Sequence, residues 1–471
     1  MGQRVHAFTT AFGCAGVTFD RMSDRAQAHV EFTPPMPPRQ SGPLGLVPLA
    51  RVMRRNPVES LAHVNFELTR ISGPFLGVTI HTLSGPEEIK AIMLDDVEAW
   101  RKSPVTQRIL RSALGDAILT AHGDSWKRQR KAMTPAFMKG RILALSEAMD
   151  RAGQGLVDTF SAANGPLDVS GPLNVATLSV IEAALFPDPG PDFDRAAVRA
   201  AIDVVIGSIG EVRFSDLFPL PEWVARPMGP RGQGALTTLR RAVEAQIARR
   251  RELGLEDDMT SLLMADTSMS DRDVRDNLLS LVVAGHETTA ITLAWALYLL
   301  SKYPKVQARV ADEARAAMSE EADPAARLAL LPFTRQVVEE TLRLYPPAPM
   351  LSRRAIRPSR IADRETGKGD LAIAAFYALH RHHRYWDNPD GFDPDRFAPD
   401  RRPSDPWVFR PFGGGPRACI GNAFALNEAI LVLARVVSEL EVRDAGDVPE
   451  PVMTITLRPK DGLRLEFAKR D

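Results

Sequence analysis

The chain has 471 residues with 59 basic and 59 acidic side chains, so its formal net charge is zero. This balance argues against a nucleic-acid partner, and a content of 44% hydrophobic and 25% charged residues excludes a wholly disordered or collagen-like chain. The two cysteines, Cys14 and Cys419, are too few for a zinc cluster and too far apart in sequence for an expected structural disulfide, which favours a reducing, cytoplasmic location.

Residues 1–33 are expected to be an N-terminal extension that could be disordered. They contain neither the ~7–15-residue apolar core of a signal peptide nor an ~18-residue apolar run. We therefore expect neither export nor a transmembrane anchor there. No Gly/Ser linker or internal repeat divides residues 34–471, so a single domain is expected over that range.

The elements expected along the body are mostly helical. Prolines separate segments rich in helix-forming residues, and the segment 230–251 ends in cations that suit the C-terminal end of a helix dipole. Alternation of β-branched residues predicts short strands at 78–82 and 454–457. The sequence therefore predicts a mainly α fold with small β-sheets.

A long helix is expected between Ser270 and Lys302. Ser270 and Asp273 form a capping-box pattern, and no proline follows until Pro304. We do not expect this helix to cross a membrane, because ionisable side chains in the segment 284–289 would be costly in lipid. That segment allows two interpretations: a kink with a back-bonded threonine, or a polar notch beside a bound group.

The chemistry expected of this chain centres on Cys419, which lies just before an expected helix at 422–437. Unpaired amides at a helix start favour a thiolate, and the glycines at 413–415 let backbone N–H groups approach the sulfur. These residues alone leave three interpretations open: a metal-bound thiolate, a small core residue, and a nucleophile with a partner histidine.

Five segments in one order resemble the motifs of the cytochrome P-450 family of heme-thiolate monooxygenases. Phe412–Gly421 resembles the cysteine-loop signature, and Ala284–Thr288 resembles the oxygen-activating motif of the long helix. The other three are the WxxxR pattern Trp126–Arg130, the ExxR pattern Glu340–Arg343 and the meander segment Pro394–Phe397 after Trp386. The resemblance covers the chain from about Pro34 onward and implies a cytochrome P-450 fold, with the long helix across a buried heme.

The resemblance implies a heme b cofactor with Cys419 as its axial thiolate ligand. It assigns the remaining heme contacts to one group of residues: Trp126, Arg130, Arg353, Arg417, Phe412 and His122. Two of these assignments have an alternative on the sequence. Arg354 could replace its neighbour Arg353, and His122 could be a solvated loop residue.

The resemblance also implies a buried structural network of Glu340, Arg343 and Arg396. Breaking such a network leaves an unpaired buried charge, which costs about 3–5 kcal/mol. A histidine cluster further along the chain looks superficially like a metal site. Because arginines interrupt it, we expect a solvated loop at His380, His382 and His383.

Glu287 and Thr288 match the acid–alcohol pair of the family, whose implied role is proton delivery during dioxygen activation. The implied reaction inserts one oxygen atom from O2 into an apolar substrate, by hydroxylation or epoxidation. The alternatives are a peroxygenase or isomerase of the same fold, and a non-catalytic heme sensor; the intact pair counts against them. The implied pocket is lined from a loop at 103–119, from the segment 187–230, and by Ala284, Ala290, Ala348 and Ile455.

The resemblance implies that electrons come from NAD(P)H through a separate partner. We expect a ferredoxin or flavodoxin with its reductase, because no flavin or ferredoxin domain is recognisable in the sequence. Lys127 and Lys131, with Arg128 beside them, are expected to form a cationic stripe on the helix that carries Trp126. The alternative is an ordinary solvated helix face.

Overall fold

The computed structural model describes residues 32–470 except positions 43, 76, 211–215, 217–219, 221–223, 225 and 255–257. Most of the expected N-terminal extension therefore lies outside the described residues. The described chain begins at Phe32, whose carbonyl accepts a hydrogen bond of 2.5 Å from the Tyr303 hydroxyl. The Phe32 ring also packs edge-on against Tyr298 and Tyr303, which ties this end of the chain to the body.

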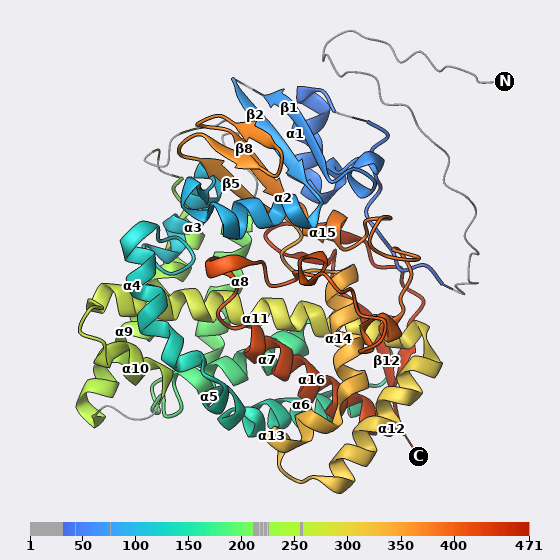
Figure 1. Ribbon diagram of the computed structural model, residues 1–471. Coiled ribbons are helices and arrows are strands. Elements are labelled where there is room, and N and C mark those ends of the chain that lie inside the picture. Colours follow the sequence, from blue (N-terminus) through green and yellow to red (C-terminus); the bar gives the residue numbers. More distant parts are fainter. Residues whose placement is uncertain are drawn as a thin grey trace, which may run out of the picture.

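The described chain is mainly helical with small sheets, as the sequence predicts (Figure 1). The helices of the first half are α1 (Leu46–Arg55), α2 (Pro86–Lys90), α3 (Pro104–Leu114), α4 (Gly123–Met133), α5 (Lys139–Ala144), α6 (Ser146–Ser161), α7 (Ser170–Leu185) and α8 (Arg195–Gly210). Those of the second half are α9 (Pro230–Leu253), α10 (Met259–Ala265), α11 (Asp271–Lys302), α12 (Pro304–Glu320), α13 (Pro324–Arg327), α14 (Pro332–Leu344), α15 (Phe376–Leu379) and α16 (Asn422–Glu439).

Proline begins many of these helices rather than only interrupting them. Pro104, Pro230 and Pro332 each occupy the first turn, where the missing N–H would have no intrahelical partner and the fixed φ already suits a helix. The start of α3 is further fixed by Ser103, whose hydroxyl accepts the Thr106 amide. The segment expected to be a pocket loop between residues 103 and 119 is therefore largely the helix α3, and that expectation was wrong.

The long helix expected between Ser270 and Lys302 is α11, which crosses the middle of the molecule (Figure 1). Its capping box is complete, because the Asp273 amide donates to the Ser270 hydroxyl and the Ser270 amide donates to the Asp273 carboxylate. The helix packs against α7, α14 and α16. It is the one helix among the described residues that is long and apolar enough to span a membrane, but 72% of its apolar window is buried in the protein.

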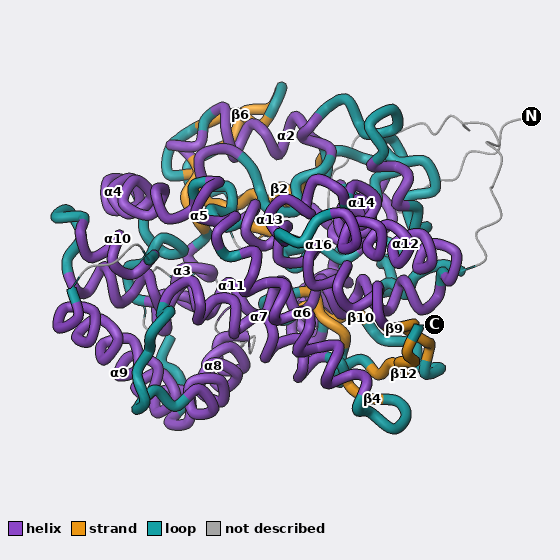
Figure 2. Tube along the Cα trace, turned by 90° about the horizontal axis from the view of Figure 1, so that it is seen from below, coloured by secondary structure: helices purple, strands orange, loops and turns teal. Residues whose placement is uncertain are grey.

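In the described part of the chain the strands form four small sheets, which are minor beside the helices (Figure 2). The largest has the order β1 (Arg70–Phe75), β2 (Val78–Leu83), β8 (Leu371–Ala374), β5 (Leu351–Ala355) and β3 (Trp100–Lys102). A second joins β4 (Leu167–Asp168), β12 (Arg464–Lys469) and β9 (Leu440–Asp444). Two hairpins complete the set: β6 (Ser359–Ile361) with β7 (Arg364–Thr366), and β10 (Pro451–Met453) with β11 (Leu457–Pro459).

One of the two expected strands is confirmed and the other is wrong. Residues 78–82 lie within β2, whereas residues 454–456 form the turn between β10 and β11. The Thr454 amide donates to the Thr456 carbonyl at 3.1 Å, which closes the turn. The alternation of threonines with apolar residues is thus the tip of a hairpin, and only Leu457 of the expected strand is in a ladder.

Candidate functional site

The segment that carries Cys419 forms a compact loop before α16. Gly413 and Gly415 have positive φ angles of 72° and 67°, which side chains rarely adopt. A Cβ at Gly415 would also overlap the carbonyl oxygen of Met93, so the loop can pack this closely only with glycine. The Cys419 amide donates to the Phe412 carbonyl at 3.0 Å, which closes the loop and fixes the cysteine one turn ahead of the helix.

The Cys419 thiol is enclosed by protein and yet accessible, as expected of a side chain that faces an internal space. Burial raises the pKa of the thiol, while the Gly421 N–H and the Arg130 charge lower it. These two groups would stabilise a thiolate once a metal has displaced the thiol proton. No group of three or more histidine, cysteine or acidic residues gathers as a metal site in the described chain, so a metal here would need ligands from a cofactor.

The centre of α11 has a partly accessible strip within an otherwise buried helix. The strip contains Ala284 and Thr288, which share a face four residues apart. The Thr288 hydroxyl donates to the Ala284 carbonyl at 3.1 Å, so the back-bonded threonine expected from the sequence is present, but the helix continues without a break. Ala290 follows about 200° further around the helix and packs in the core, away from this strip.

Gly285 lets α11 approach its neighbour closely. A Cβ at this position would lie 2.5 Å from Cδ1 of Ile181 on α7. On the same side, the Thr177 hydroxyl donates to the His286 carbonyl at 2.8 Å. His286 itself is buried, and burial lowers its pKa. The glycine is therefore explained by helix packing, and the strip of Ala284 and Thr288 is what remains open.

Three cations converge beside the cysteine loop. Lys102 on β3 and Arg353 on β5 are direct cross-strand neighbours. Burial lowers the pKa of Lys102 well below its usual value, and the charges of Arg353 and Arg417 lower it further. Burial, followed by the Arg417 charge, lowers the pKa of Arg353 to about 10. Arg354 is only partly buried, and Arg353 is the one of the two arginines that lies in this cluster. Its expected contact with heme stays a prediction.

The tryptophan–arginine motif lies against the same loop. The Arg417 guanidinium stacks over the Trp126 ring, 4.3 Å from its centroid, and donates to the Ala121 carbonyl at 3.1 Å. Arg130 donates to the Ala418 carbonyl at 3.0 Å. These contacts bring α4 to the cysteine loop, as the positions of both residues four apart on one helix allow.

His122 supplies an unused donor to this cluster. The Gln107 amide lies 2.7 Å from Nε2 of His122, and with the amide as donor the ring proton lies on Nδ1. Burial lowers the pKa of His122 to about 4, with Arg417 and Lys102 adding to the effect, so the ring is neutral. Its Nδ1 is buried and has no hydrogen-bond partner in the described chain.

The cluster has a large excess of donors and positive charge. Among the described residues, no carboxylate lies within ion-pair distance of Lys102, Arg353 or Arg417. Glu98 acts on Arg417 from further away and raises its pKa, and Lys102 donates to the Leu119 carbonyl. Enclosed cations without counter-charges are unfavourable unless an anion completes the site. The residues therefore fit a ligand that carries carboxylates, such as the two propionates of heme b.

Glu340, Arg343 and Arg396 meet in the core, where the structure places them in one network. The Arg343 guanidinium donates to both Glu340 oxygens at 2.6 and 2.8 Å, and Arg396 donates to Glu340 at 3.2 Å. Other Arg343 hydrogens go to the carbonyls of His380, Pro389 and Gly391. These hydrogen bonds hold the meander segment against α14, the helix that carries Glu340 and Arg343.

The histidine cluster is not a solvated loop, contrary to the sequence interpretation. His380 and His382 are fully buried, and only His383 is exposed. Arg381 between them is also buried, because it pairs with Asp390 at 3.1 Å and lies over the Tyr377 ring. Burial lowers the pKa of His380 to about 3, and its Nε2 accepts the Arg410 amide. His380, Arg381 and His382 are thus packed into the core as structural support.

Two buried ionisable residues near the site escaped the sequence interpretation. Lys102 belongs to no motif, and only the cross-strand register places it beside Arg353. Glu428 lies on the buried face of α16 with neither oxygen hydrogen-bonded in good geometry, and burial raises its pKa to about 8 despite a favourable contribution from the Thr289 hydroxyl. A single acid within the apolar run of α16 was the available signal.

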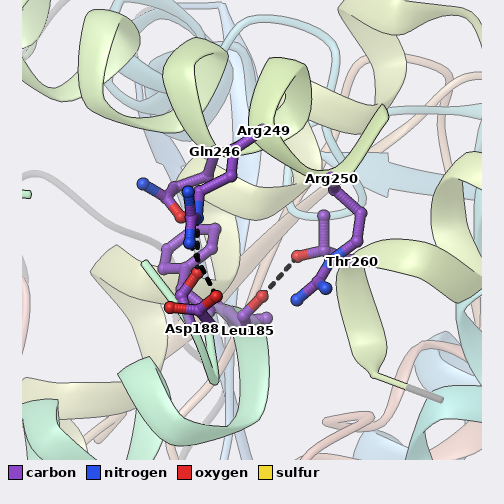
Figure 3. A pocket seen from close by; sticks show the side chains of 7 residues that line it. Leu185, Asp188, Gln246, Arg249, Arg250 and Thr260 are labelled. Carbon is purple, nitrogen blue, oxygen red and sulfur yellow. Dashed lines mark hydrogen bonds and ion pairs between the residues drawn. The ribbon is translucent and has the colours of Figure 1, made fainter. Parts of the chain in front are cut away.

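Of the four single residues expected to line a substrate pocket, three are accessible enough to do so. Ala284, Ala348 and Ile455 are each partly accessible. A separate small pocket lies between the end of α7, α9 and α10, where Arg249 bonds to Asp188 and Thr260 donates to the Leu185 carbonyl (Figure 3). None of the residues that line this small pocket belongs to the cysteine loop or to α16, which follows that loop. The side chains of the lining residues fill the pocket.

The fold and the site together define a mainly α protein in which Cys419, the one cysteine among the described residues, lies with an anion cradle beside a long central helix. The cytochrome P450 family model matches residues 37–467, which is most of the chain. The chain therefore belongs to the cytochrome P450 family. It is a heme-binding monooxygenase in which a cysteine thiolate is the axial ligand.

Similar proteins come from bacteria, plants and mammals. Cyclooctatin synthase of Streptomyces melanosporofaciens is 28% identical over 437 residues, which span 89% of this chain and 93% of the relative. Taurochenodeoxycholic 6 alpha-hydroxylase of Sus scrofa is 30% identical over 82% of this chain and 81% of its own length. The chloroplastic protein LUTEIN DEFICIENT 5 of Arabidopsis thaliana is 28% identical over 82% of this chain and 70% of its own length.

Proposed function

We propose that Cys419 is the axial ligand and that the chain inserts one oxygen atom of O2 into an apolar organic molecule, by hydroxylation or epoxidation. The observation that carries this proposal is the position of an accessible, enclosed thiol beside a partly enclosed cluster of three cations that has no carboxylate within ion-pair distance. Heme held by a thiolate supplies the activation of dioxygen, because thiolate ligation favours cleavage of the O–O bond.

In this proposal the residues of the cation cluster hold the two propionates. Lys102, Arg353 and Arg417 provide charge, and Nδ1 of His122 provides a neutral donor. Trp126 keeps the Arg417 guanidinium in place by stacking, and Arg130 ties α4 to the loop. Phe412 contributes its carbonyl to the loop closure and its partly buried ring to the wall beside the cofactor.

Glu287 and Thr288 move protons in this proposal. The Thr288 hydroxyl lies on the open strip of α11, and Glu287 follows about 100° away around the helix, toward charged groups nearer the surface. Burial raises the pKa of Glu287, which brings this carboxyl closer to the pH at which it can both take and give a proton. This pair favours dioxygen as the oxidant over peroxide, and it also counts against a non-catalytic sensor or an isomerase.

The substrate is proposed to be a hydrophobic molecule in contact with Ala284, Ala348 and Ile455. The name of the relative from Sus scrofa is that of a hydroxylase, which supports hydroxylation as the reaction type. A screen of apolar compounds for a spin-state shift in the heme spectrum would identify ligands without the need for an electron donor.

Electrons are proposed to come from NAD(P)H through a separate ferredoxin or flavodoxin and its reductase. The residues Lys127, Arg128 and Lys131 are exposed on α4, which contacts the cysteine loop through Arg130. We also propose that residues 34–471 form one heme domain and that the protein works in the cytoplasm.

The ligand assignment is tested by the spectrum of the reduced protein under carbon monoxide. The parent protein is expected to show the strongly red-shifted Soret band of a thiolate-ligated heme, and Cys419→His is expected to lose it. Cys14→Ser is the matched control and should keep the band. Retention of the band in Cys419→His together with its loss in Cys14→Ser would show that the assignment is wrong.

A further inference from the structure

The hairpin of β10 and β11 is anchored to the rest of the protein through both of its strands. The Leu457 amide donates to the Pro347 carbonyl at 3.0 Å, and Nε1 of Trp295 on α11 donates to the Leu457 carbonyl at 3.3 Å. On the other strand, Asn56 donates to the Pro451 carbonyl at 2.9 Å and accepts the Met453 amide at 3.0 Å. Both strands are therefore held in a fixed position over α11.

Arg458 extends from this fixed strand to Glu287. Leu457 and Pro459 on either side of it are buried, so strand alternation points the Arg458 side chain outward. Its Nη1 lies 3.6 Å from Oε1 of Glu287, and the two side chains are 45% and 12% exposed. This contact is the one ion pair of Glu287 in the described part of the chain, and it joins a nearly enclosed carboxylate to a side chain that reaches solvent.

The other groups around Glu287 are few. Besides Arg458, the Thr456 hydroxyl at the hairpin tip lowers the pKa of the carboxyl, although its geometry is too loose for a regular hydrogen bond. Asp203 on α8, which is exposed, raises that pKa, and burial is the largest influence in the same direction. Arg458 is thus the nearest positive charge that opposes burial.

We propose that Arg458 is a positioning residue for proton delivery: it holds the Glu287 carboxylate on the solvent-facing side of α11 and keeps it in contact with solvent. This inference rests on the proposed role of Glu287 and Thr288. In each cycle Glu287 gives its proton to the Thr288 hydroxyl as that hydroxyl passes its own proton on, and the carboxylate then takes a new proton from water beside Arg458. No electrons move in these steps.

The position of Arg458 explains why removal of its charge should affect the Glu287 carboxyl more than removal of a surface charge elsewhere. An ion pair at 3.6 Å that is half open to solvent is loose, so the carboxylate can leave it and return within a catalytic cycle. Without Arg458 the carboxyl would lose its favourable charge, and burial and Asp203 would raise its pKa without opposition. It would stay protonated and turn away from the solvent side.

The test compares Arg458→Gln with Lys460→Gln in the holoenzyme with a compound that the spectral screen has identified. Lys460 lies on the same hairpin and pairs with Glu450 at 2.8 Å on the exposed side, so this control removes one charge without touching Glu287. We expect Arg458→Gln to lower product formed per NAD(P)H severalfold, to raise the solvent isotope effect, and to shift the pH profile of coupling to higher pH. Arg458→Lys should restore part of the coupling.

Peroxide-driven turnover separates proton delivery from a structural effect. Hydrogen peroxide brings the oxygen atom together with its protons and electrons, so Arg458→Gln should leave this activity and the substrate-induced spectral shift unchanged. A fall in both the peroxide-driven and the dioxygen-driven reactions would show a structural defect and overturn the inference. Unchanged or improved coupling in Arg458→Gln would overturn it as well.

The failure of this inference is distinguishable from a failure of the proposed function. If Glu287→Gln and Thr288→Ala both uncouple the enzyme while Arg458→Gln does not, the acid–alcohol pair stands and the role of Arg458 is refuted. If all three variants remain coupled, the proton pathway itself lies elsewhere and the proposed roles of Glu287 and Thr288 fail.

Discussion

Lys102 on β3 and Arg353 on β5 face each other as direct cross-strand partners, so two like charges meet in a partly enclosed site. Like charges directly opposite each other destabilise a strand pair, and neither cation has a carboxylate partner in the described chain. Lys102 donates to the Leu119 carbonyl and Arg353 to the Ser352 carbonyl, but neither carbonyl neutralises a charge, so an anion beside the two side chains would stabilise the pair. We therefore interpret it as a preformed half of an anion site.

Lys102→Met should weaken retention of heme and stabilise the heme-free chain. The variant loses a charge-assisted hydrogen bond of about 1.5–3 kcal/mol, which corresponds to about tenfold to hundredfold faster heme loss. In the heme-free chain the same change relieves the repulsion between Lys102 and Arg353. Heme transfer to apomyoglobin and thermal unfolding of the heme-free chain measure the two effects, and the exposed Lys127→Met is the control. Equal heme retention in both variants would remove Lys102 from the site.

Glu340→Gln should strongly destabilise the fold, although it changes only one polar atom. The variant leaves the buried guanidiniums of Arg343 and Arg396 without their shared counter-charge, at a cost of about 3–5 kcal/mol. Thermal unfolding followed by circular dichroism should show a clear fall in melting temperature. Arg464→Gln breaks an equally well-formed but exposed pair with Asp447 and should change it little. Similar effects for both variants would contradict a special role for the buried network.

Glu428→Gln should make the protein less sensitive to pH. Burial raises the pKa of Glu428 to about 8 in the folded protein, from its ordinary value of 4.5 in an unfolded chain. Between these values the folded protein holds a proton that the unfolded chain has released, so stability falls as pH rises, by about 1.4 kcal/mol per pH unit, and levels off above the folded pKa. Glutamine resembles the protonated carboxyl and does not ionise. Glu428→Gln should therefore not show this fall in stability as pH rises.

The Glu428 prediction is measured as the difference in melting temperature between variant and parent. This difference should grow in favour of Glu428→Gln as pH rises from about 5 to about 8 and then stay constant. The exposed Glu320→Gln at the end of α12 is the control and should show no such trend. A difference that is independent of pH would mean that Glu428 ionises normally in the folded protein.

The parts of the structure that the sequence predicted depend on local patterns. The capping box of Ser270 and Asp273 marked the start of α11, because the residues that satisfy a helix start lie three apart. Glu340 and Arg343 are likewise three residues apart, so the sequence also predicted that they share one helix face. Their burial with Arg396, in contrast, was implied only by resemblance, since nothing local shows that a paired charge is buried.

The parts that the sequence missed depend on long-range packing. Lys102 and Arg353 are 251 residues apart and meet only because β3 and β5 pair, which no local pattern reveals. His380 and His382 looked solvated because arginines flank them, yet Arg381 is itself buried by its bonds to Asp390 and Leu344. The turn at residues 454–456 has the composition of a strand, and only its place between two paired strands makes it a hairpin tip.

The last prediction concerns the docking of the electron donor. Lys127 and Lys131 lie four apart on α4 and are exposed on the helix that contacts the cysteine loop through Arg130. Oε1 of Glu98 lies 3.3 Å from Nζ of Lys127, and Oδ2 of Asp273 lies 3.3 Å from Nη2 of Arg128. These two carboxylates already neutralise part of the positive charge of the stripe. The stripe that remains is small, and its effect should appear in the rate of association rather than in the strength of the complex.

Reduction of the heme by an acidic ferredoxin or flavodoxin should therefore slow as ionic strength rises, because salt screens charges beyond about 10 Å at 0.1 M. Lys127→Glu combined with Lys131→Glu should slow reduction at low salt and leave the carbon monoxide spectrum unchanged. Stopped-flow absorbance measures the rate of heme reduction and records the carbon monoxide spectrum. The control reverses the exposed Lys305 on α12 and the exposed Lys368 between β7 and β8. Helix α12 lies on the other side of the molecule from α4 (Figure 1). If the control slows reduction as much as the α4 variant does, the donor is attracted by overall charge and docks on no particular face.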